Sequence, residues 1–471
     1  MSVQGRVEPR DLAPEPGSFR DPLSRVWLAG GEVYRTLSPE GMADWEALST
    51  SRLFAEATAD GSLVATERVE GNAIPADGAA AVLRHERIPF VSYPYEWPFS
   101  MLRDAALLQL SLLRRALDEG LTTKDASPYN VQWRGAKPVF VDIGSFEDLR
   151  EGEPWAGYRQ FCMLFLYPLL LTALRGADYR PLLRGSVDGI EPGQMRALLG
   201  RRDLLRRGVM THVTLHARLE EHHADDVDVK RELRSAGFKA ELVKANVRRL
   251  EKLVRRLRWD PGETAWTRYG TTTTYSEGDA ERKAAFVRAA ASARSRGLVW
   301  DLGANDGRYT RIAAEHSDYA VAIDADVAVV DRLYHALRDE GSTRILPLAA
   351  NVADPPPGLG WRGRERGTLP DRGRPDLILA LAVVHHLVIG SNVPIPELVD
   401  WLAELGAELV VEFPTPADPM VARLIARKRE GTHADYTQER WERALGSAFE
   451  IEASERLGDG ARVLYRARPR R

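Results

Sequence analysis

The sequence of 471 residues contains a single cysteine, Cys162, which excludes a disulfide within the chain and a metal site built on thiolates. Residues 1–21 are rich in proline and charge and lack the apolar core of a signal peptide. The apolar run from Phe161 to Leu174 is too short to cross a bilayer, which needs about 20 residues, so we expect a buried helix there. These absences lead us to expect a cytoplasmic protein with no membrane partner.

An excess of charge of either sign is also absent. The chain carries 65 Lys and Arg against 68 Asp and Glu, which gives a formal net charge of −3. The bulk charge therefore predicts neither a nucleic-acid partner nor attachment to a membrane surface. The length is sufficient for two to three domains, each with its own core, and no pattern in the chain indicates an oligomeric state.

The most informative stretch is residues 299–307, Val-Trp-Asp-Leu-Gly-Ala-Asn-Asp-Gly, an apolar strand that runs into a turn of small residues. Gly303 and Gly307 permit a positive φ and a close approach of the backbone to a ligand. Asn305 stands where similar turns have a further glycine, and asparagine tolerates left-handed geometry next best.

Two cofactors fit such a turn, a dinucleotide or S-adenosylmethionine (SAM). Asp301, at the head of the turn, distinguishes them. A carboxylate there repels a pyrophosphate, whereas it accepts hydrogen bonds from the ammonium group of a methionine moiety. The turn therefore favours SAM.

Strand and helix patterns alternate after this turn, which predicts a Rossmann-like parallel sheet of seven strands with a terminal hairpin. Polar residues follow the expected strands: Asp324, Asn351, His385 with His386, and Glu412. Ligands of such sheets bind at the carboxyl ends of the strands. We predict that Asp324 binds the ribose hydroxyls and Asn351 the adenine, and that His385 or His386 is the base if the acceptor needs one. A structural role for one histidine stays open.

Further candidates lie before and within this region. Tyr269 and Tyr275 precede the first strand and can cover the sulfonium with their aromatic faces, or they can be packing residues. A long insertion at 354–374 is a candidate substrate loop, or a solvated charged loop. The candidate substrate-binding residues are Arg268, Trp361, Arg362, Arg364, Arg366 and Glu412.

The N-terminal half contains Asp125, Asn130 five residues later and Asp142 at a strand end. This is the spacing of the catalytic and metal-binding loops of protein-kinase-like folds. No lysine occurs before Lys124, so only an arginine such as Arg35 could pair with nucleotide phosphates, and Arg and Lys are not interchangeable. We interpret this half as a kinase-like scaffold without phosphotransfer. Active phosphotransfer and a purely structural set of turn residues remain alternatives, as does a partner-binding module.

Several local patterns complete this half. We expect a hairpin at 26–35, a helix at 42–55, strands at 63–66 and 88–93, and helices at 100–119 and 238–259. His212 and His216 lie four residues apart, as two metal ligands on a helix do, but their apolar neighbours favour a packed face, and we expect no metal.

Residues 264–471 resemble class I SAM-dependent methyltransferases in the glycine turn, the Ala-Ile-Asp strand end and the Val-Val-His-His-Leu loop. From about Glu32 onwards the chain also resembles bacterial host-specific nodulation-protein-like methyltransferases, in Tyr-Glu-Trp at 95–97, Lys-Asp-Ala-Ser at 124–127, Val-His-His-Leu at 384–387 and Asp-Tyr-Thr at 435–437. The resemblance implies transfer of a methyl group from SAM to an O, N or C acceptor on a small-molecule or carrier-bound substrate. The expected domains are a flexible lead-in at 1–21, a non-catalytic kinase-like α+β domain rich in helices at 22–225, a linker helix at 226–263 and an α/β methyltransferase domain at 264–471.

Overall fold

The computed structural model describes residues 12–69, 78–150, 152–217, 240–262 and 277–470. Within these ranges no helix is long and apolar enough to span a bilayer. The chain divides into two compact units, and each exchanges a short piece of sequence with the other. Unit 1 comprises 1–133, 138–261 and 358–366, and unit 2 comprises 134–137, 262–357 and 367–471.

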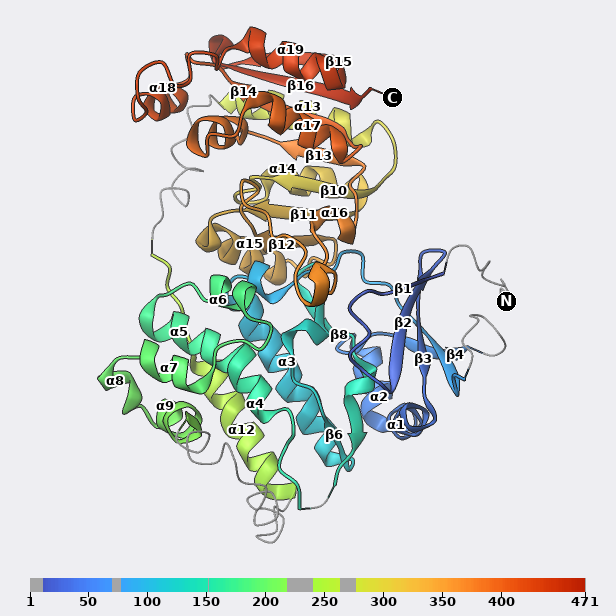
Figure 1. Ribbon diagram of the computed structural model, residues 1–471. Helices are drawn as coiled ribbons and strands as arrows, with labels where there is room; N and C mark the ends of the chain where they lie inside the picture. The colour runs from blue at the N-terminus through green and yellow to red at the C-terminus, as the bar shows by residue number, and fades with distance from the viewer. Residues whose placement is uncertain (1–11, 70–77, 151, 218–239, 263–276, 471) are drawn as a thin grey trace. The chain divides into compact units, whose positions relative to one another are not determined.

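Unit 1 begins with an antiparallel sheet in the order β1-β2-β3-β5-β4 (Figure 1). Its strands are β1 (Ala13–Pro14), β2 (Ser24–Ala29), β3 (Glu32–Leu37), β4 (Thr66–Val69) and β5 (Ala81–His85). The hairpin predicted at 26–35 is confirmed, because β2 pairs with β3 through the turn at Gly30 and Gly31, both of which have positive φ.

The helix predicted at 42–55 is two helices, α1 (Pro39–Ser49) and α2 (Arg52–Ala59). The break lies at Ser51, whose hydroxyl accepts a hydrogen bond from the Phe54 amide and so starts a new helix. The strand predicted at 88–93 was also wrong. Pro89 supplies no amide donor, and the side chain of Gln132 bonds both the N–H and the C=O of Ser92 in place of a neighbouring strand.

The remainder of unit 1 is mainly helical. Its long helices α3 (Phe99–Asp118) and α12 (Ala240–Arg256) pack against each other, so α12 is part of this unit and not a free linker. The other helices are α4 (Tyr158–Phe161), α5 (Tyr167–Arg175), α6 (Arg180–Gly185), α7 (Pro192–Leu198), α8 (Arg201–Leu204) and α9 (Arg207–Val209), with π-helical turns η5 (Cys162–Leu166) and η6 (Met210–Thr214). Two short strand pairs follow, β6 (Leu121–Thr123) with β9 (Phe146–Asp148) and β7 (Val131–Arg134) with β8 (Lys137–Phe140). Residues 134–137, at the turn between β7 and β8, are counted with unit 2.

Unit 2 is a seven-stranded sheet in the order β12-β11-β10-β13-β14-β16-β15. Its strands are β10 (Arg296–Leu302), β11 (Ser317–Asp324), β12 (Ile345–Ala349), β13 (Leu377–Ala380), β14 (Glu408–Pro414), β15 (Phe449–Leu457) and β16 (Arg462–Pro469). The first five are parallel, and β16 returns antiparallel to both β14 and β15. Every residue of β12 and β13 is buried, as expected for strands covered on both faces.

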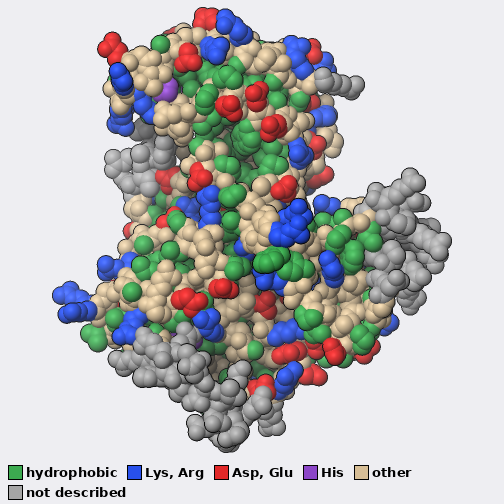
Figure 2. Space-filling view, viewed as in Figure 1, with side chains coloured by type: hydrophobic (Ala, Val, Ile, Leu, Met, Phe, Trp, Pro, Cys, Tyr) green, Lys and Arg blue, Asp and Glu red, His purple; other side chains and the backbone are tan. Residues whose placement is uncertain are grey.

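Helices flank this sheet (Figure 1): α13 packs against α14, and α17 against α19. The helices of unit 2 are α13 (Glu277–Ser292), α14 (Arg308–Ala314), α15 (Val327–Asp339), α16 (Leu369–Arg372), α17 (Ile395–Glu404), α18 (Pro419–Ile425) and α19 (Gln438–Ala448), with the π-helical turn η9 (His386–Gly390). On the face seen in Figure 2, Lys and Arg are interspersed with Asp and Glu, in keeping with the small net charge.

Candidate cofactor and acceptor site

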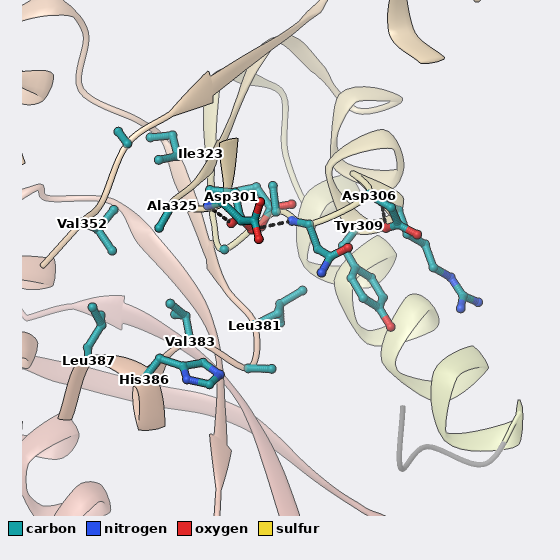
Figure 3. A pocket seen from close by; sticks show the side chains of 18 of the residues that line it. Asp301, Asp306, Tyr309, Ile323, Ala325, Val352, Leu381, Val383, His386 and Leu387 are labelled. Carbon is teal, nitrogen blue, oxygen red and sulfur yellow. Dashed lines mark hydrogen bonds between the residues drawn. The ribbon is translucent and has the colours of Figure 1, made fainter. Parts of the chain in front are cut away.

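A cavity of about 350 Å³ opens at the carboxyl ends of the central strands of unit 2 (Figure 3). This volume lies within the range of small-molecule sites. Ile323, Ala325 and Val352 line one end, and His386 lies at the other end beside Val383 and Leu387. The predicted residues that line the cavity are Asp301, Gly303, Asn305, Asp324, Asn351 and His386.

The turn after β10 is held tightly against β11. The amides of Gly303 and Ala304 both donate to the carbonyl of Ile323, at 2.8 and 3.0 Å. Gly303 and Gly307 have φ of 79° and 75°, and the space beside Gly303 is filled by the Val383 side chain. A side chain at Gly303 therefore meets both backbone strain and a close contact.

Asn305 has a φ of 48°, which accounts for an asparagine where similar turns have glycine. Its amide donates to Oδ2 of Asp324 at 2.9 Å. We expect Asn305→Gly to leave SAM affinity within about threefold of wild type, because glycine keeps the same backbone and amide. Asn305→Val should weaken SAM binding about tenfold or more, since a β-branched residue resists positive φ. Calorimetric titration of both variants checks this, and equal affinities for the two would contradict the backbone explanation.

Asp301 is the next-to-last residue of β10 and is 2% exposed. The Thr310 hydroxyl donates to its Oδ2 at 2.5 Å. Burial raises the pKa of Asp301 to about 7, although the Thr310 hydrogen bond and the charge of Lys283 act to lower it. Burial therefore makes the carboxylate costly to ionise, and a cationic ligand group beside it favours its charged form.

Asp324 ends β11 and has both carboxylate oxygens fixed by backbone amides. Oδ2 accepts from Asn305 and Oδ1 from Asp326, each at 2.9 Å. Asp326 has a separate role as the N-cap of α15, where it accepts from the Ala328 and Val329 amides. Asn351 is exposed at the end of β12, and its Oδ1 accepts from the Ala353 amide. The predicted residues Arg268, Tyr269 and Tyr275 lie outside the described residues.

The two histidines after β13 differ in position. His386 lines the cavity, whereas His385 is fully buried and does not. Their rings lie 3.9 Å apart between centroids. Burial lowers the pKa of His386 to about 4, with a further lowering by Arg462, and burial lowers the pKa of His385 well below its ordinary value. Both imidazoles are therefore neutral near pH 7.

Sequence reasoning missed Lys283 and Tyr309, which also line the cavity. Lys283 is 3% exposed, its Nζ donates to Glu412 at 2.6 Å, and it lies 4.6 Å from the centre of the Tyr309 ring. In the sequence, Lys283 could have been found because it is a charged residue on the apolar face of α13. Glu412, predicted to bind substrate, is fully buried and is bonded by Lys283 and Arg462 outside the cavity lining.

The predicted substrate loop belongs partly to unit 1. Residues 358–366 form a tight turn in which Trp361 is 65% exposed, and Arg362 and Arg364 are also exposed. Arg366 is buried against the Tyr129 ring, 5.0 Å from its centroid, and Arg20 binds Glu365 at 2.6 Å. None of the residues 358–366 lines the described cavity.

The residues of the kinase-like pattern do lie together in unit 1. Asn130 donates to the Ser145 hydroxyl, and Ser145 donates to Oδ2 of Asp142. Burial raises the pKa of Asp125, and the charge of Asp142 raises it further. Arg35 from β3 binds Asp142 at 2.9 Å, which places a guanidinium on the carboxylate that the pattern assigns to Mg²⁺.

We therefore expect Mg-ATP to leave the melting temperature of the full chain unchanged within about 1 °C. Arg35 already neutralises Asp142, and the described cavity beside Gly144 holds only about 10 Å³, room for roughly one water molecule. Thermal unfolding with and without 5 mM Mg-ATP, roughly a saturating concentration, checks this. A rise that is lost in Asp142→Ala would establish nucleotide binding instead.

His212 and His216 are bonded to tyrosines and not arranged around a metal. Their Nδ1 atoms contact the hydroxyls of Tyr158 and Tyr167 at 2.8 and 2.9 Å. In the described ranges, no group of three or more His, Cys, Asp or Glu residues could hold a metal ion.

The sheet order, the glycine turn headed by a buried acid and the cavity at the strand ends define unit 2 as a class I methyltransferase domain whose cofactor is SAM. No model of a known protein family matches the chain. The chain belongs to the family of nodulation protein NoeA of Rhizobium meliloti (strain 1021), with which it is 30% identical over 462 residues that cover 96% of both proteins.

Among solved structures, the chain is similar to the N-methyltransferase NodS from Bradyrhizobium japonicum WM9 in complex with S-adenosyl-L-homocysteine (SAH), with 14% identity and a TM-score of 0.32. The similarity covers 43% of this chain and 91% of NodS. Magnesium protoporphyrin IX methyltransferase from Synechocystis PCC 6803 with bound SAH is also similar, with 18% identity, a TM-score of 0.30, and coverage of 45% of this chain and 91% of that chain.

Proposed function

We propose that the protein transfers the methyl group of SAM to an oxygen, nitrogen or carbon atom of a small-molecule or carrier-bound acceptor. The observation that carries this proposal is the convergence of Asp301, the turn residues 303–306, Asp324 and Asn351 on one cavity, whereas Gly307 does not line it. A single cysteine, Cys162, fits the reducing cytoplasm as the place where it acts.

The two carboxylates bind different parts of SAM. Asp301 accepts hydrogen bonds from the ammonium group of the methionine moiety, and its buried position makes that interaction strong. Asp324, whose oxygens are fixed by two amides, binds the ribose hydroxyls with its remaining lone pairs. Asn351 contacts the adenine near the apolar end formed by Ile323 and Val352.

The chemical step needs mainly positioning, because methyl transfer is an in-line displacement from a positively charged sulfur. The sulfonium is a good leaving group, so the chain must hold the acceptor atom in line with the carbon–sulfur bond. If the acceptor carries a proton, His386 is positioned to receive it, since its neutral ring lines the cavity. The His385 ring contacts the His386 ring and so supports its position.

The exposed side chains of Trp361 and Arg364 remain candidates for acceptor recognition, together with Arg268. Trp361 and Arg364 extend from a turn whose anchors, Glu365 and Arg366, are already paired within unit 1. Such an arrangement presents a cationic, aromatic tip to an anionic part of the acceptor or of its carrier.

A transfer assay tests this function. The protein is incubated with SAM labelled in the methyl group and an extract of the source cells, and label is measured in the small-molecule, protein and nucleic-acid fractions. We expect label in the small-molecule or carrier-protein fraction, lost in Asp324→Ala but retained in Asp318→Ala, which removes an exposed acid of the same strand. Label confined to nucleic acid, or label independent of Asp324, would reject the proposal.

A further inference from the structure

Four charged side chains form a buried chain that starts at the cavity wall. Nζ of Lys283 on α13 donates to Oε2 of Glu412 on β14 at 2.6 Å. Nη1 of Arg462 on β16 donates to Oε1 of the same carboxylate at 3.2 Å, and Nε of Arg462 donates to Oδ2 of Asp418 at 2.7 Å. Each of the four residues is at most 3% exposed.

Stability alone does not explain this arrangement. Burying ion pairs costs about as much free energy as the pairing returns, and apolar residues of similar volume often stabilise a fold more. The chain of charges lies at the carboxyl end of β14, where open sheets place their ligands, and its first member lines the cavity. This location indicates a role in the site.

Helix α18, which Asp418 caps, packs against the turn η9 that begins at His386, so the chain of charges reaches the element that carries the histidine pair. Arg462 on β16 and Asp418 at the N-terminus of α18 act on His386, and Arg462 and Lys283 act on His385. Helix α17 also packs against the turn η9, but its acidic residues Glu397, Asp400 and Glu404 are exposed to solvent.

Arg462 is the group common to these interactions. We propose that Arg462 is a positioning residue on the acceptor side of the cavity. It holds the Glu412 and Asp418 carboxylates and, through Glu412, fixes Lys283 at the cavity wall. Its guanidinium also supplies a positive charge that acts on the His386 ring. This inference rests on the proposed function, in which His386 receives a proton from the acceptor. The inference means that a residue of β16, a strand away from the cofactor turn, controls the proton affinity of the base His386.

The test needs no acceptor. Histidine-labelled full-length protein is titrated by NMR, with the His386 signal assigned from its loss in His386→Gln. We expect the proton affinity of His386 to rise at least tenfold in Arg462→Gln and to stay within threefold of wild type in Arg462→Lys, which restores the charge. Arg466→Gln is the matched control, since Arg466 lies on the same strand but pairs with Glu408 and Glu452.

If Arg462→Gln fails to fold, the double variant Asp418→Asn, Arg462→Gln removes two paired charges together and leaves the Lys283–Glu412 pair intact. We expect its His386 proton affinity to rise at least threefold. An unchanged titration in every folded Arg462 variant would overturn the inference.

SAM calorimetry on the same proteins separates this inference from the proposed function. Affinity within threefold of wild type in the Arg462 variants supports an acceptor-side role. An affinity loss as large as that of Asp324→Ala would place Arg462 in the cofactor site and overturn the inference, whereas absence of SAM binding by the wild-type protein would overturn the proposed function itself.

Discussion

Replacing Asp301 by asparagine is expected to lower SAM affinity about a hundredfold and, at pH 8, to stabilise the protein without cofactor. The affinity loss follows from removing a buried, charge-assisted hydrogen bond, worth on the order of 2–3 kcal/mol. The stability gain follows from the raised pKa of Asp301, about 7, which means that the folded state resists its ionisation.

The direction of the pH effect is fixed by that raised pKa. Because the carboxyl holds its proton more tightly in the folded than in the unfolded chain, its contribution to stability is fully present below pH 4 or so and is lost as pH rises through about 7. Asparagine has no such loss. Thermal unfolding at pH 5 and pH 8 should therefore show a larger advantage for Asp301→Asn at pH 8, on the order of 2–4 kcal/mol at most.

Asp306→Asn is the matched control, since Asp306 lines the same cavity but is exposed. It should change SAM affinity by no more than about twofold, and it should change the pH dependence of stability much less than Asp301→Asn does, since the Asp306 charge is only a minor cause of the raised Asp301 pKa. An Asp301→Asn protein that binds SAM as wild type does, or that is less stable than wild type at pH 8, would contradict the role assigned to this carboxylate.

Acidification from pH 7 to pH 4.5 should cost the protein several kcal/mol of stability. Burial lowers the pKa of four histidines: His85 to about 3, His212 and His386 to about 4, and His385 well below its ordinary value. A lowered folded-state pKa gives stability that is present above pH 6.5 and is lost as pH falls towards the folded value. Each histidine contributes at most about 1.4 kcal/mol per pH unit in that interval.

The two units should respond separately, because His85 and His212 belong to unit 1 and the histidine pair belongs to unit 2. Chemical denaturation followed at several pH values measures the slope. His212→Gln should flatten the acid dependence of unit 1 unfolding by about 1 kcal/mol per pH unit, whereas His335→Gln, at a half-buried position in unit 2, should leave it unchanged. A stability that is independent of pH between 7 and 4.5 would contradict the neutral, buried state of these rings.

The fold of unit 2 could be predicted because its central strands are nearly continuous apolar runs with a polar residue at or close to the carboxyl end. Asp301, Asp324 and Asn351 carry that signal locally, and parallel pairing then brings their strand ends to one edge. Unit 1 was less predictable. Its strands are short and its breaks depend on single interactions, such as the Ser51 cap and the bonds of Gln132 to Ser92.

The acceptor side could be predicted only in part. A repeated histidine marks the loop after β13, but which ring reaches the cavity depends on the local backbone, where Ala382 takes a φ of 55°. Lys283 and Glu412 lie 129 residues apart, so neither sequence context shows that they pair. Asp418 before Pro419 is a local signal for the start of α18, but its pairing with Arg462 depends on the antiparallel return of β16, which no local pattern encodes.

Calorimetric titration of the full chain with SAM tests the central claim most directly, with Asp324→Ala and its exposed neighbour on the same strand, Asp318→Ala, measured beside it. Wild type and Asp318→Ala should bind one SAM with equal affinity, and Asp324→Ala should bind at least about thirtyfold more weakly because two buried hydroxyl contacts are lost. No binding by the wild-type chain, or equal binding by all three proteins, would contradict the assignment of this cavity to SAM.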